Sequence, residues 1–450
     1  MLKNLSFCYF LKFLLVFAAV NFIQSCSKDD SPKVDTETSI EDVPIPEEPE
    51  EEPSFMPVGS VEVFLDDKVD DNYILVNDAA SNQVYLMDKE ARLLHEWSLT
   101  NNIGNDVFLL PNGQLLASLE ADDPQIKLGG KGGKLQLIGP NGAVEWDYLY
   151  SSMDRETHHD AELLPNGNII AMVWTKHSAE EALQSGFMFE TDVFVESIIE
   201  IDPNTDEIVW EWHSWDHIVQ DHDSTKNNYG NIADHPERID VNYVPMSNAS
   251  TESDGDIMHA NGIAYDKLND AILLSVNFFS EVWVIDHSTS TEEASTSSGG
   301  NYGKGGDLIY RFGNPETYKN TFGERQFYNN HFPNLLKGMD LGKLLIFSNG
   351  FNIEQSTVYE LELPSEYDLK PDRDNELNIL WSYTNPDLYS GKISGAVTLP
   401  NGNVLITEGD FGFWEVTREK EVVWKFSAEG FFWRGYSYAK DAPEIKLLGL

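Results

Sequence analysis

The chain has 450 residues, of which 41% are hydrophobic, and this ordinary globular composition excludes disorder throughout. Its 76 acidic and 30 basic residues give a formal net charge of −46, and a surface this acidic repels a phosphate backbone, so we expect no nucleic-acid partner. Both cysteines, Cys8 and Cys26, lie at the extreme N-terminus, which excludes a disulfide framework and a cysteine nucleophile from the folded body.

The first 25 residues have the pattern of an export signal. Lys3 and Lys12 flank the start of a mostly apolar run, which continues to Ile23. The run ends in Ile-Gln-Ser-Cys, which resembles a bacterial lipobox, the sequence at which the signal is cut and the cysteine is acylated. We therefore predict that residues 1–25 are a signal peptide and that Cys26 carries a lipid. The alternative is a plain membrane anchor with an incidental cysteine.

Residues 26–57 are rich in proline and acidic residues and contain few large apolar side chains. Such a segment cannot bury enough surface to offset its ordering entropy, so we predict a flexible tether. The Ser-Lys-Asp-Asp that follows Cys26 resembles the acidic export tag of surface lipoproteins in Bacteroidetes-type bacteria. We expect an exported protein that is attached to the outer membrane only through its lipid, on the periplasmic or cell-surface side.

Residues 58–450 contain a repeated pattern of short strands. The first element of the repeat is a strand that leads into Leu-Pro-Asn-Gly, and Asn-Gly favours a tight hairpin because both residues tolerate a positive φ. Clear copies occur at Leu110–Gly113, Leu164–Gly167 and Leu399–Gly402, and degenerate copies at Ile263–Val276 and Leu335–Ser348. The second element is a strand that ends in Trp or Phe, with copies at Leu94–Trp97, Val144–Trp146, Ile208–Trp212, Leu308–Phe312, Ile379–Trp381 and Val422–Phe426.

Six copies of such a unit predict an all-β fold, a six-bladed β-propeller. The units are longer than common propeller repeats, and the excess falls in long inter-strand insertions at residues 213–258 and 287–306. We expect Trp433–Ala439 to supply a strand that closes the ring against the first blade. Independent hairpins or a β-sandwich are the alternatives, and the in-phase copies disfavour both.

Three histidines occupy one position of the repeat. His159 lies six residues before Pro165, and aligning the degenerate copies places His259 and His331 at the same position. This position should begin the innermost strand of each blade, so the three imidazoles should converge at one end of the central channel. Imidazole is a nucleophile, base or cationic donor near neutral pH. We favour a catalytic or anion-binding set; a transition-metal site is the second reading, and three structural hydrogen-bonding residues the third.

Several longer blocks carry a resemblance to a known family. They are His158-His159-Asp160 before LLPNGN, Trp215-Asp216-His217, HPERIDVNY at 235–243, SEVWVIDHSTS at 280–290 and YGKGGDLIYRFGNP at 302–315. With these blocks the chain, from about residue 60 to 440, resembles the bacterial arylsulfotransferases (aryl-sulfate sulfotransferases). The resemblance implies an exported six-bladed propeller.

The resemblance also implies a reaction. The family transfers a sulfuryl group from a phenolic sulfate donor to a phenol acceptor without a nucleotide donor, a cofactor or a metal, through a sulfohistidine. By position, His331 would be the nucleophile, and His259 and His159 would bind the sulfate oxygens and protonate the leaving phenolate. His158 is the alternative to His159, because the family motif can contain both. Developing negative charge on the sulfate oxygens makes such donors effective.

One residue departs from the family pattern. Where the family has arginine in a Ser-x-Arg setting, this chain has Asn277 after Ser275. Arginine offers a charged fork to a sulfate, whereas asparagine offers a neutral amide at this substrate-binding position. Lys304 and Arg325 are the candidate substitutes for the charge. The departure favours the alternative function, a non-catalytic surface propeller that binds an aromatic or sulfated ligand, while the three histidines favour the enzyme.

Overall fold

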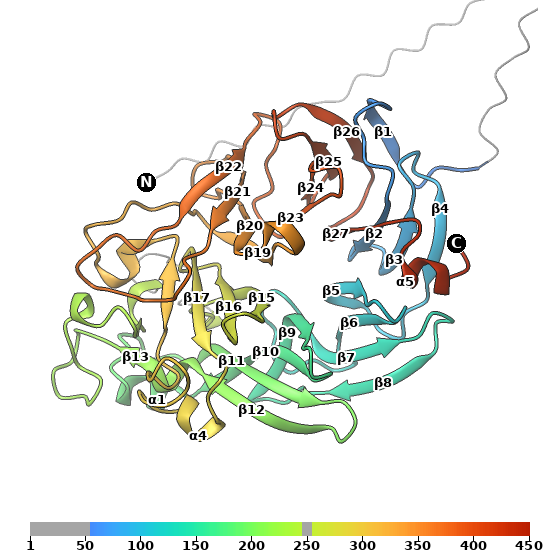
Figure 1. Cartoon of the computed structure of the whole chain (residues 1–450). Coiled ribbons are helices and arrows are strands. Elements are labelled where there is room, and N and C mark those ends of the chain that lie inside the picture. Colours follow the sequence, from blue (N-terminus) through green and yellow to red (C-terminus); the bar gives the residue numbers. More distant parts are fainter. Residues whose placement is uncertain (1–54, 245–253) are drawn as a thin grey trace, which may run out of the picture. The chain divides into compact units, whose positions relative to one another are not determined.

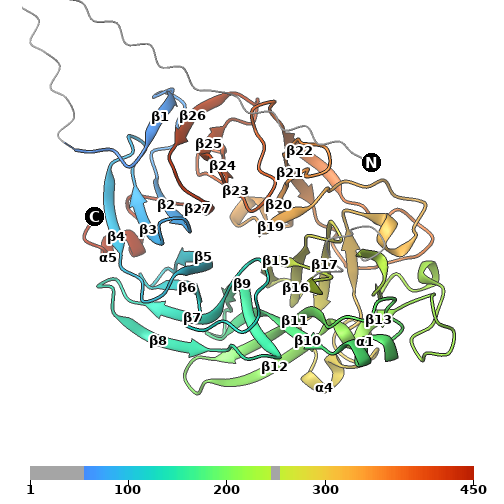
Figure 2. The ribbon, with the colours of Figure 1, turned by 180° about the vertical axis from the view of Figure 1, so that it is seen from behind.

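The structure is a computed structural model and describes residues 55–244 and 254–450. The predicted signal peptide, Cys26 and most of the predicted tether lie outside these residues. The described body, from Phe55 onward, is a ring of small β-sheets (Figures 1 and 2). No helix within this body has the length and apolar character needed to cross a membrane.

Six antiparallel sheets in the described residues are the blades, which confirms the predicted six-bladed propeller. From the centre of the ring outward, the first blade consists of β27 (Phe432–Tyr438), β2 (Tyr73–Asp78), β3 (Gln83–Met87) and β4 (Leu93–Trp97). The second consists of β5 (Ile103–Leu109), β6 (Leu115–Glu120), β7 (Gly133–Ile138) and β8 (Val144–Leu149). The third consists of β9 (Arg155–Leu163), β10 (Ile169–His177), β11 (Val193–Asp202) and β12 (Glu207–His213). The fourth blade consists of β15 (Ala260–Asp266), β16 (Ala271–Val276), β17 (Glu281–Asp286) and β18 (Tyr310–Phe312). The fifth consists of β19 (Asn330–Leu335), β20 (Lys343–Ser348), β21 (Thr357–Glu362) and β22 (Asn378–Tyr383). The sixth consists of β23 (Gly395–Thr398), β24 (Val404–Glu408), β25 (Gly412–Val416), β26 (Val422–Ser427) and β1 (Ser60–Phe64).

Both ends of the body close the ring. The six innermost strands contact one another in the cyclic order β27, β5, β9, β15, β19, β23 and back to β27, as Figure 1 shows. The C-terminal strand β27 pairs with β2, so the predicted closing strand at Trp433–Ala439 is confirmed. At the other end of the body, β1 pairs with β26 and becomes the outermost strand of the last blade. The ring is thus closed by two strands from opposite ends of the body.

The Leu-Pro-Asn-Gly sequences form the predicted hairpins between the first and second strands of their blades. In the first copy, the N–H of Gly113 donates to the carbonyl of Leu110, and the side chain of Asn112 accepts from the N–H of Gln114. Gly113 has φ +83°, a left-handed conformation that glycine adopts without the steric cost of a Cβ. Each blade then packs its apolar side chains against the next blade, and Trp174, Trp212, Trp283 and Trp424 are fully buried there.

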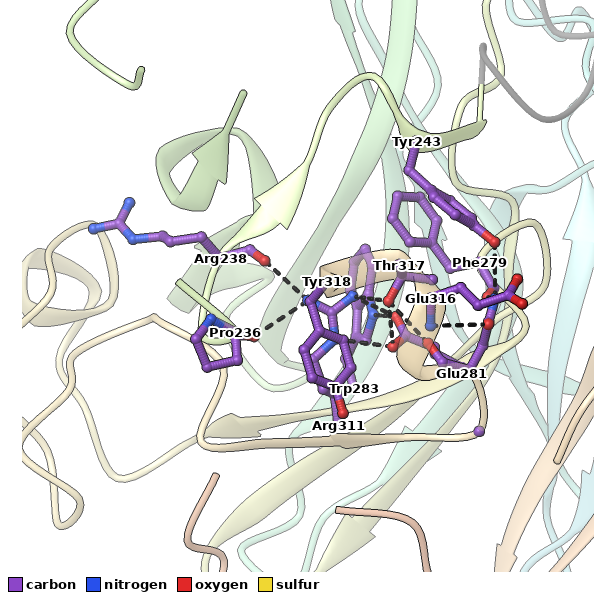
Figure 3. A network of polar contacts seen from close by, with 12 residues as sticks. Pro236, Arg238, Tyr243, Phe279, Glu281, Trp283, Arg311, Glu316, Thr317 and Tyr318 are labelled. Atoms are coloured by element: carbon purple, nitrogen blue, oxygen red, sulfur yellow. Dashed lines mark hydrogen bonds and ion pairs between the residues drawn. The ribbon is translucent and has the colours of Figure 1, made fainter. Parts of the chain in front are cut away.

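The insertion before β15 folds against the fourth blade around one buried arginine. Arg311, on β18, pairs with Glu281 on β17, and both side chains are fully buried. The same guanidinium donates to the backbone carbonyls of Pro236 and Arg238 in the insertion, as Figure 3 shows. Its Cζ lies 4.7 Å from the centroid of the Tyr318 ring. One side chain therefore fixes the inserted segment to the blade.

Short elements occupy the connections between the strands, and one, α5, follows the last strand. They are α1 (Ala179–Gln184), α4 (Thr291–Ala294), α5 (Pro443–Leu447), the 3-10 helices η1 (Ser214–His217), η2 (Ile232–Asp234), η3 (Pro315–Tyr318) and η4 (Gly338–Asp340), and a parallel pair of β13 (Ile218–Val219) and β14 (Ile239–Asp240). Both predicted insertions thus carry some of these elements: η1, β13, η2 and β14 lie in residues 213–258, and α4 lies in residues 287–306.

Candidate active site

The three histidines of the repeat lie on or beside the innermost strands of three consecutive blades. His159 is the fifth residue of β9, His259 directly precedes β15, and His331 is the second residue of β19. A β-bulge interrupts the pairing of each inner strand with the next strand at this point. His159 and His259 have φ values of +50° and +51°, a left-handed conformation uncommon for residues with a Cβ. In the fifth blade this conformation falls one residue later, at Phe332.

The bulges bring the imidazoles close together at the centre of the ring. The ring centroids of His159 and His259 are 5.0 Å apart and nearly perpendicular. The positive charge on His259 is among the causes that lower the pKa of His331, although burial is the largest cause. His159 is 1% exposed and His331 is 8% exposed, whereas the His259 side chain is 19% exposed. Solvent or a ligand therefore reaches the group most easily at His259.

His331 is held in one tautomer by Asn349. Its Nδ1 lies 2.6 Å from Oδ1 of Asn349, and the Nδ2 of Asn349 donates to the backbone carbonyls of Ser390 and Ile393. Because carbonyls only accept, the amide oxygen must face the imidazole, and Nδ1 of His331 must carry the proton. Burial lowers the pKa of His331 to about 3, so the ring is neutral at pH 7. Its Nε2 therefore has a free lone pair, which is what a nucleophile needs.

His259 has the opposite electrostatic setting because it faces a buried carboxylate. Its Nδ1 lies 2.5 Å from Oδ2 of Asp256, and its backbone N–H donates to Oδ1 of the same residue. Burial by itself lowers the pKa of His259, but the charge and the hydrogen bond of Asp256 raise it, and the pKa lies above its ordinary value. The ring lies against Phe278, with a centroid separation of 4.8 Å. The contact with Asp256 thus favours the protonated ring, in which both nitrogens carry an N–H.

His159 is bonded to a second histidine instead of an acid. Its Nδ1 lies 2.8 Å from Nδ1 of His158, whose Nε2 lies 2.9 Å from Oε2 of Glu196. His158 stacks on Trp174 with ring centroids 4.1 Å apart. Both nitrogens of His158 are thus occupied inside the protein, and it lies behind His159. Burial lowers the pKa of His158 to about 3 and the pKa of His159 well below its ordinary value.

Asn277 is buried beside the strand that carries His331. Its Nδ2 donates to the carbonyl of Asn330, and its Oδ1 accepts from Nδ2 of Asn329. Of the two candidate substitute cations, Arg325 donates to Ser280, which also accepts from the backbone N–H of Asn329. Lys304 lies in the connection between β17 and the outermost strand β18. Asn277 therefore supports the start of β19.

An arginine at the centre of the ring comes from the closing strand, and it was not among the candidate residues. Nη1 of Arg434, on β27, lies 2.8 Å from Asp106 and 2.9 Å from Asp160, and Nη2 donates to the carbonyl of Asn261. Burial and Arg434 act in opposite directions on Asp160, and burial raises its pKa to about 6. The guanidinium thus joins four inner strands, β27, β5, β9 and β15, with its charge offset by two carboxylates.

A glycine-rich loop lies against the histidines from the second blade. A Cβ placed on Gly130 would stand 1.7 Å from Cε1 of His159, and a Cβ on Gly129 would stand 3.3 Å from Cε1 of His259. Gly130 also has φ +80°, which disfavours any other residue. In residues 55–244 and 254–450, no group of three or more histidine, cysteine or acidic side chains has the arrangement of a metal site. The site is a set of three imidazoles, and Nδ1 of each is hydrogen-bonded to another side chain of the protein.

Comparison with known proteins identifies the family. The family model described as Arylsulfotransferase (ASST) matches residues 62–430, which is most of the chain. The chain belongs to the arylsulfotransferase family. No curated protein matches this arylsulfotransferase-family chain.

Two solved structures are similar to this family member in fold. One is a protein of unknown function from Bacteroides caccae, with 13% identity and a TM-score of 0.45 over 82% of this chain and 98% of that chain. The other is a putative 6-phosphogluconolactonase from Bacteroides fragilis, with 10% identity and a TM-score of 0.38 over 81% of this chain and 83% of that chain.

Asp256, Glu196, Asn349 and Arg434 are the site residues of this arylsulfotransferase-family chain that sequence reasoning missed. Asp256 stands three residues before His259, and this local Asp-x-x-His spacing is a signal that could have been used. Glu196 and Asn349 lie on or after other strands of their blades, with no local motif around them.

Proposed function

We propose that this protein is an aryl sulfotransferase, independent of a nucleotide sulfate donor, that moves a sulfuryl group from a phenolic sulfate to a phenol through a sulfohistidine on His331. The family membership supports the class of reaction. The observation that carries the choice of His331 is its contact with Asn349, which leaves a neutral ring with a free Nε2 lone pair. No cofactor takes part.

In the first half-reaction, the Nε2 lone pair of His331 forms a bond to sulfur while the bond from sulfur to the phenolic oxygen breaks. The leaving oxygen takes the electron pair and receives a proton from Nε2 of His159. The sulfo-imidazole retains its proton on Nδ1, and this N–H donates a hydrogen bond to Oδ1 of Asn349. In the second half-reaction, a phenol oxygen attacks the sulfur, its proton goes to His159, and Nε2 of His331 regains its lone pair. A covalent intermediate divides one difficult displacement into two.

His259 stabilises the transition state in this proposal. Its pKa is raised, which favours the protonated ring, whose Nε2–H directs positive charge toward the sulfate oxygens. Charged donors fixed in a dry site are effective because they need no reorganisation as the charge develops. Here His259 takes the role that arginine has in the family pattern, and Asn277 acts by supporting β19.

The test is the intact mass of the full chain after incubation with 4-nitrophenyl sulfate in the absence of an acceptor. We expect one added SO₃ group, mapped by peptide fragmentation to His331 and lost on addition of phenol. The variant His331→Ala should gain no such group. The matched control is His235→Ala, because His235 is an exposed histidine in the insertion, and it should gain the group normally. A sulfuryl group on another histidine of the wild type would overturn the choice of nucleophile.

The second candidate is a non-catalytic propeller that binds an aromatic or sulfated ligand, and Asn277 is the observation that favours it. Both polar atoms of its side chain are engaged by Asn329 and Asn330, so no charged group occupies the family's arginine position. Calorimetric binding of an aryl sulfate by a wild type that neither turns over nor gains a sulfuryl group would select this candidate.

We also propose that the mature protein begins at a lipidated Cys26 and is held at the outer membrane by that lipid. The lipobox-like end of the apolar run and the acidic tether after it support this proposal. Replacing Cys26 with alanine should block processing and release the protein from membranes. Unchanged membrane attachment of Cys26→Ala would refute it.

A further inference from the structure

Glu196, His158 and His159 form an unbroken line of hydrogen bonds from the interior of the third blade to the reacting centre. Oε2 of Glu196, on β11, lies 2.9 Å from Nε2 of His158, and the two Nδ1 atoms of His158 and His159 are 2.8 Å apart. Each of the three residues is about 1% exposed. The other carboxylate oxygen of Glu196 accepts from the backbone N–H of Ala260, directly after His259. Water therefore has no place in this line.

This line has only two arrangements when both rings are neutral, because each hydrogen bond needs one donor and one acceptor. If Glu196 is protonated, it donates to Nε2 of His158, Nδ1–H of His158 donates to His159, and the proton of His159 sits on Nε2. If Glu196 is ionised, every proton shifts by one place, and Nε2 of His159 has a lone pair instead. The protonation of Glu196 thus decides whether His159 presents a donor or an acceptor.

We propose that Glu196 is the proton store of the transfer reaction, and that His158 relays its proton to and from His159. This inference rests on the proposed function and assigns two further residues to it. Neither residue contacts the substrate: both act through His159.

The protons balance over the two half-reactions. When the phenolate leaves, it takes the proton from Nε2 of His159, Nδ1–H of His158 passes to Nδ1 of His159, and the carboxyl proton of Glu196 passes to Nε2 of His158. When the acceptor phenol attacks, its proton enters at Nε2 of His159 and each transfer runs backward. Glu196 is therefore a carboxylate only while His331 carries the sulfuryl group, and both histidines are neutral in each resting state.

The electrostatic setting favours a relay over a simple imidazolium acid. Burial and the positive charge of His259 lower the pKa of His159 well below its ordinary value, so His159 cannot hold two protons near pH 7. Burial raises the pKa of Glu196 well above its ordinary value, which favours the protonated carboxyl group in the resting protein. A general acid is thus available at His159, although burial excludes an imidazolium at this residue.

The variant Glu196→Gln tests the relay. Its amide oxygen can accept from Ala260 and its N–H can donate to His158, so the variant keeps the resting arrangement but has no proton to release. General acid catalysis contributes about 10²–10⁴-fold, and more to poor leaving groups. We expect single-turnover release of phenol from phenyl sulfate to slow by about 10²-fold or more, and release of the acidic 4-nitrophenol from 4-nitrophenyl sulfate to slow by under about threefold.

The matched control is Glu200→Gln. Glu200 is on the same strand and is also bonded to a histidine, His287, but that pair lies outside the site. The control should release both phenols at the wild-type rate. Equal slowing of Glu196→Gln on both donors, or slowing on neither, would show that Glu196 has a structural role only. A wild type that releases neither phenol would instead reject the proposed function. The relay would then be tested by the tautomers of His158 and His159 alone.

Those tautomers are measured without turnover. NMR of the ligand-free protein with nitrogen-labelled histidine should show His158 protonated at Nδ1 and His159 protonated at Nε2, in both the wild type and Glu196→Gln. A proton on Nδ1 of His159 in the wild type would overturn the proposal, because the line would then have no proton to give.

Discussion

Oδ1 of Asn349 lies 2.6 Å from Nδ1 of His331, and neither of the other two histidines of the repeat meets an amide oxygen at this ring atom. His259 meets a carboxylate at the same ring atom, and His159 meets a second imidazole. Three rings at one repeat position thus have three different partners. The partner of Nδ1 decides whether Nε2 is a nucleophile, a charged donor or an exchangeable proton site.

Replacing Asn349 with alanine should therefore slow sulfuryl transfer without unfolding the ring. The imidazole of His331 would be free to place its proton on Nε2 and lose the attacking lone pair. Enforcing the wrong histidine tautomer costs about 10⁴ in a serine protease, and here alanine merely permits it, so we expect about 10²-fold in kcat. Rates of sulfo-His331 formation by rapid quench measure this, with circular dichroism as the control for folding. A wild-type rate would show that Asn349 does not set the tautomer.

The pH dependence should separate His331 from His259. The pKa of His331 is about 3, so protonation of the nucleophile should not slow the reaction between pH 8 and pH 5. The pKa of His259 is raised, so its positive charge persists to higher pH than that of an ordinary histidine and is lost as pH rises through the raised pKa. We expect the rate to fall on the alkaline side. The variant His259→Gln should be slower at neutral pH and should lack this fall, which kcat/KM profiles of both proteins will reveal.

Replacing Gly130 with alanine should disable the site by displacing the loop from His159. The new Cβ would meet Cε1 of His159 at 1.7 Å. We expect a loss of at least about 10² in kcat/KM, which is the effect of a small misplacement of reacting groups. The control is Gly142→Ala, which has a similar φ of +77° but open space around its Cβ. It should cost about 1–2 kcal/mol of stability and no activity.

Replacing Arg434 with methionine should destabilise the fold. Methionine retains the packing over Phe332, but Asp106 and Asp160 lose their buried cation. Removing one partner of a buried ionic group costs about 3–5 kcal/mol. The control is Lys440→Met, because Lys440 forms an exposed ion pair with Asp71, and it should cost under about 1 kcal/mol. Urea unfolding of both variants gives the comparison, and equal midpoints would contradict the assignment.

The sequence by itself determined the architecture. Asn-Gly at fixed offsets requires hairpins, and the copies of the strand unit require blades, because each unit must bury its apolar faces against neighbours. Aligning the copies of the repeat already placed His159, His259 and His331 at one position, since equivalent residues of a closed ring lie at the same end of it. These conclusions depend on local patterns, which one chain displays in full.

Only the tertiary structure decided what each histidine can do. Asn349 is 18 residues from His331, Glu196 is 38 residues from His158, and Arg434 is 328 residues from Asp106, and no local pattern links the members of any of these pairs. Such partners meet because separate strands of a blade, or opposite ends of the body, are brought side by side. The protonation of a buried imidazole depends on the group within hydrogen-bond distance and on the depth of burial. The hydrogen-bond partner and the depth of burial are both properties of the closed ring, and the residues next to the histidine in the sequence predict neither.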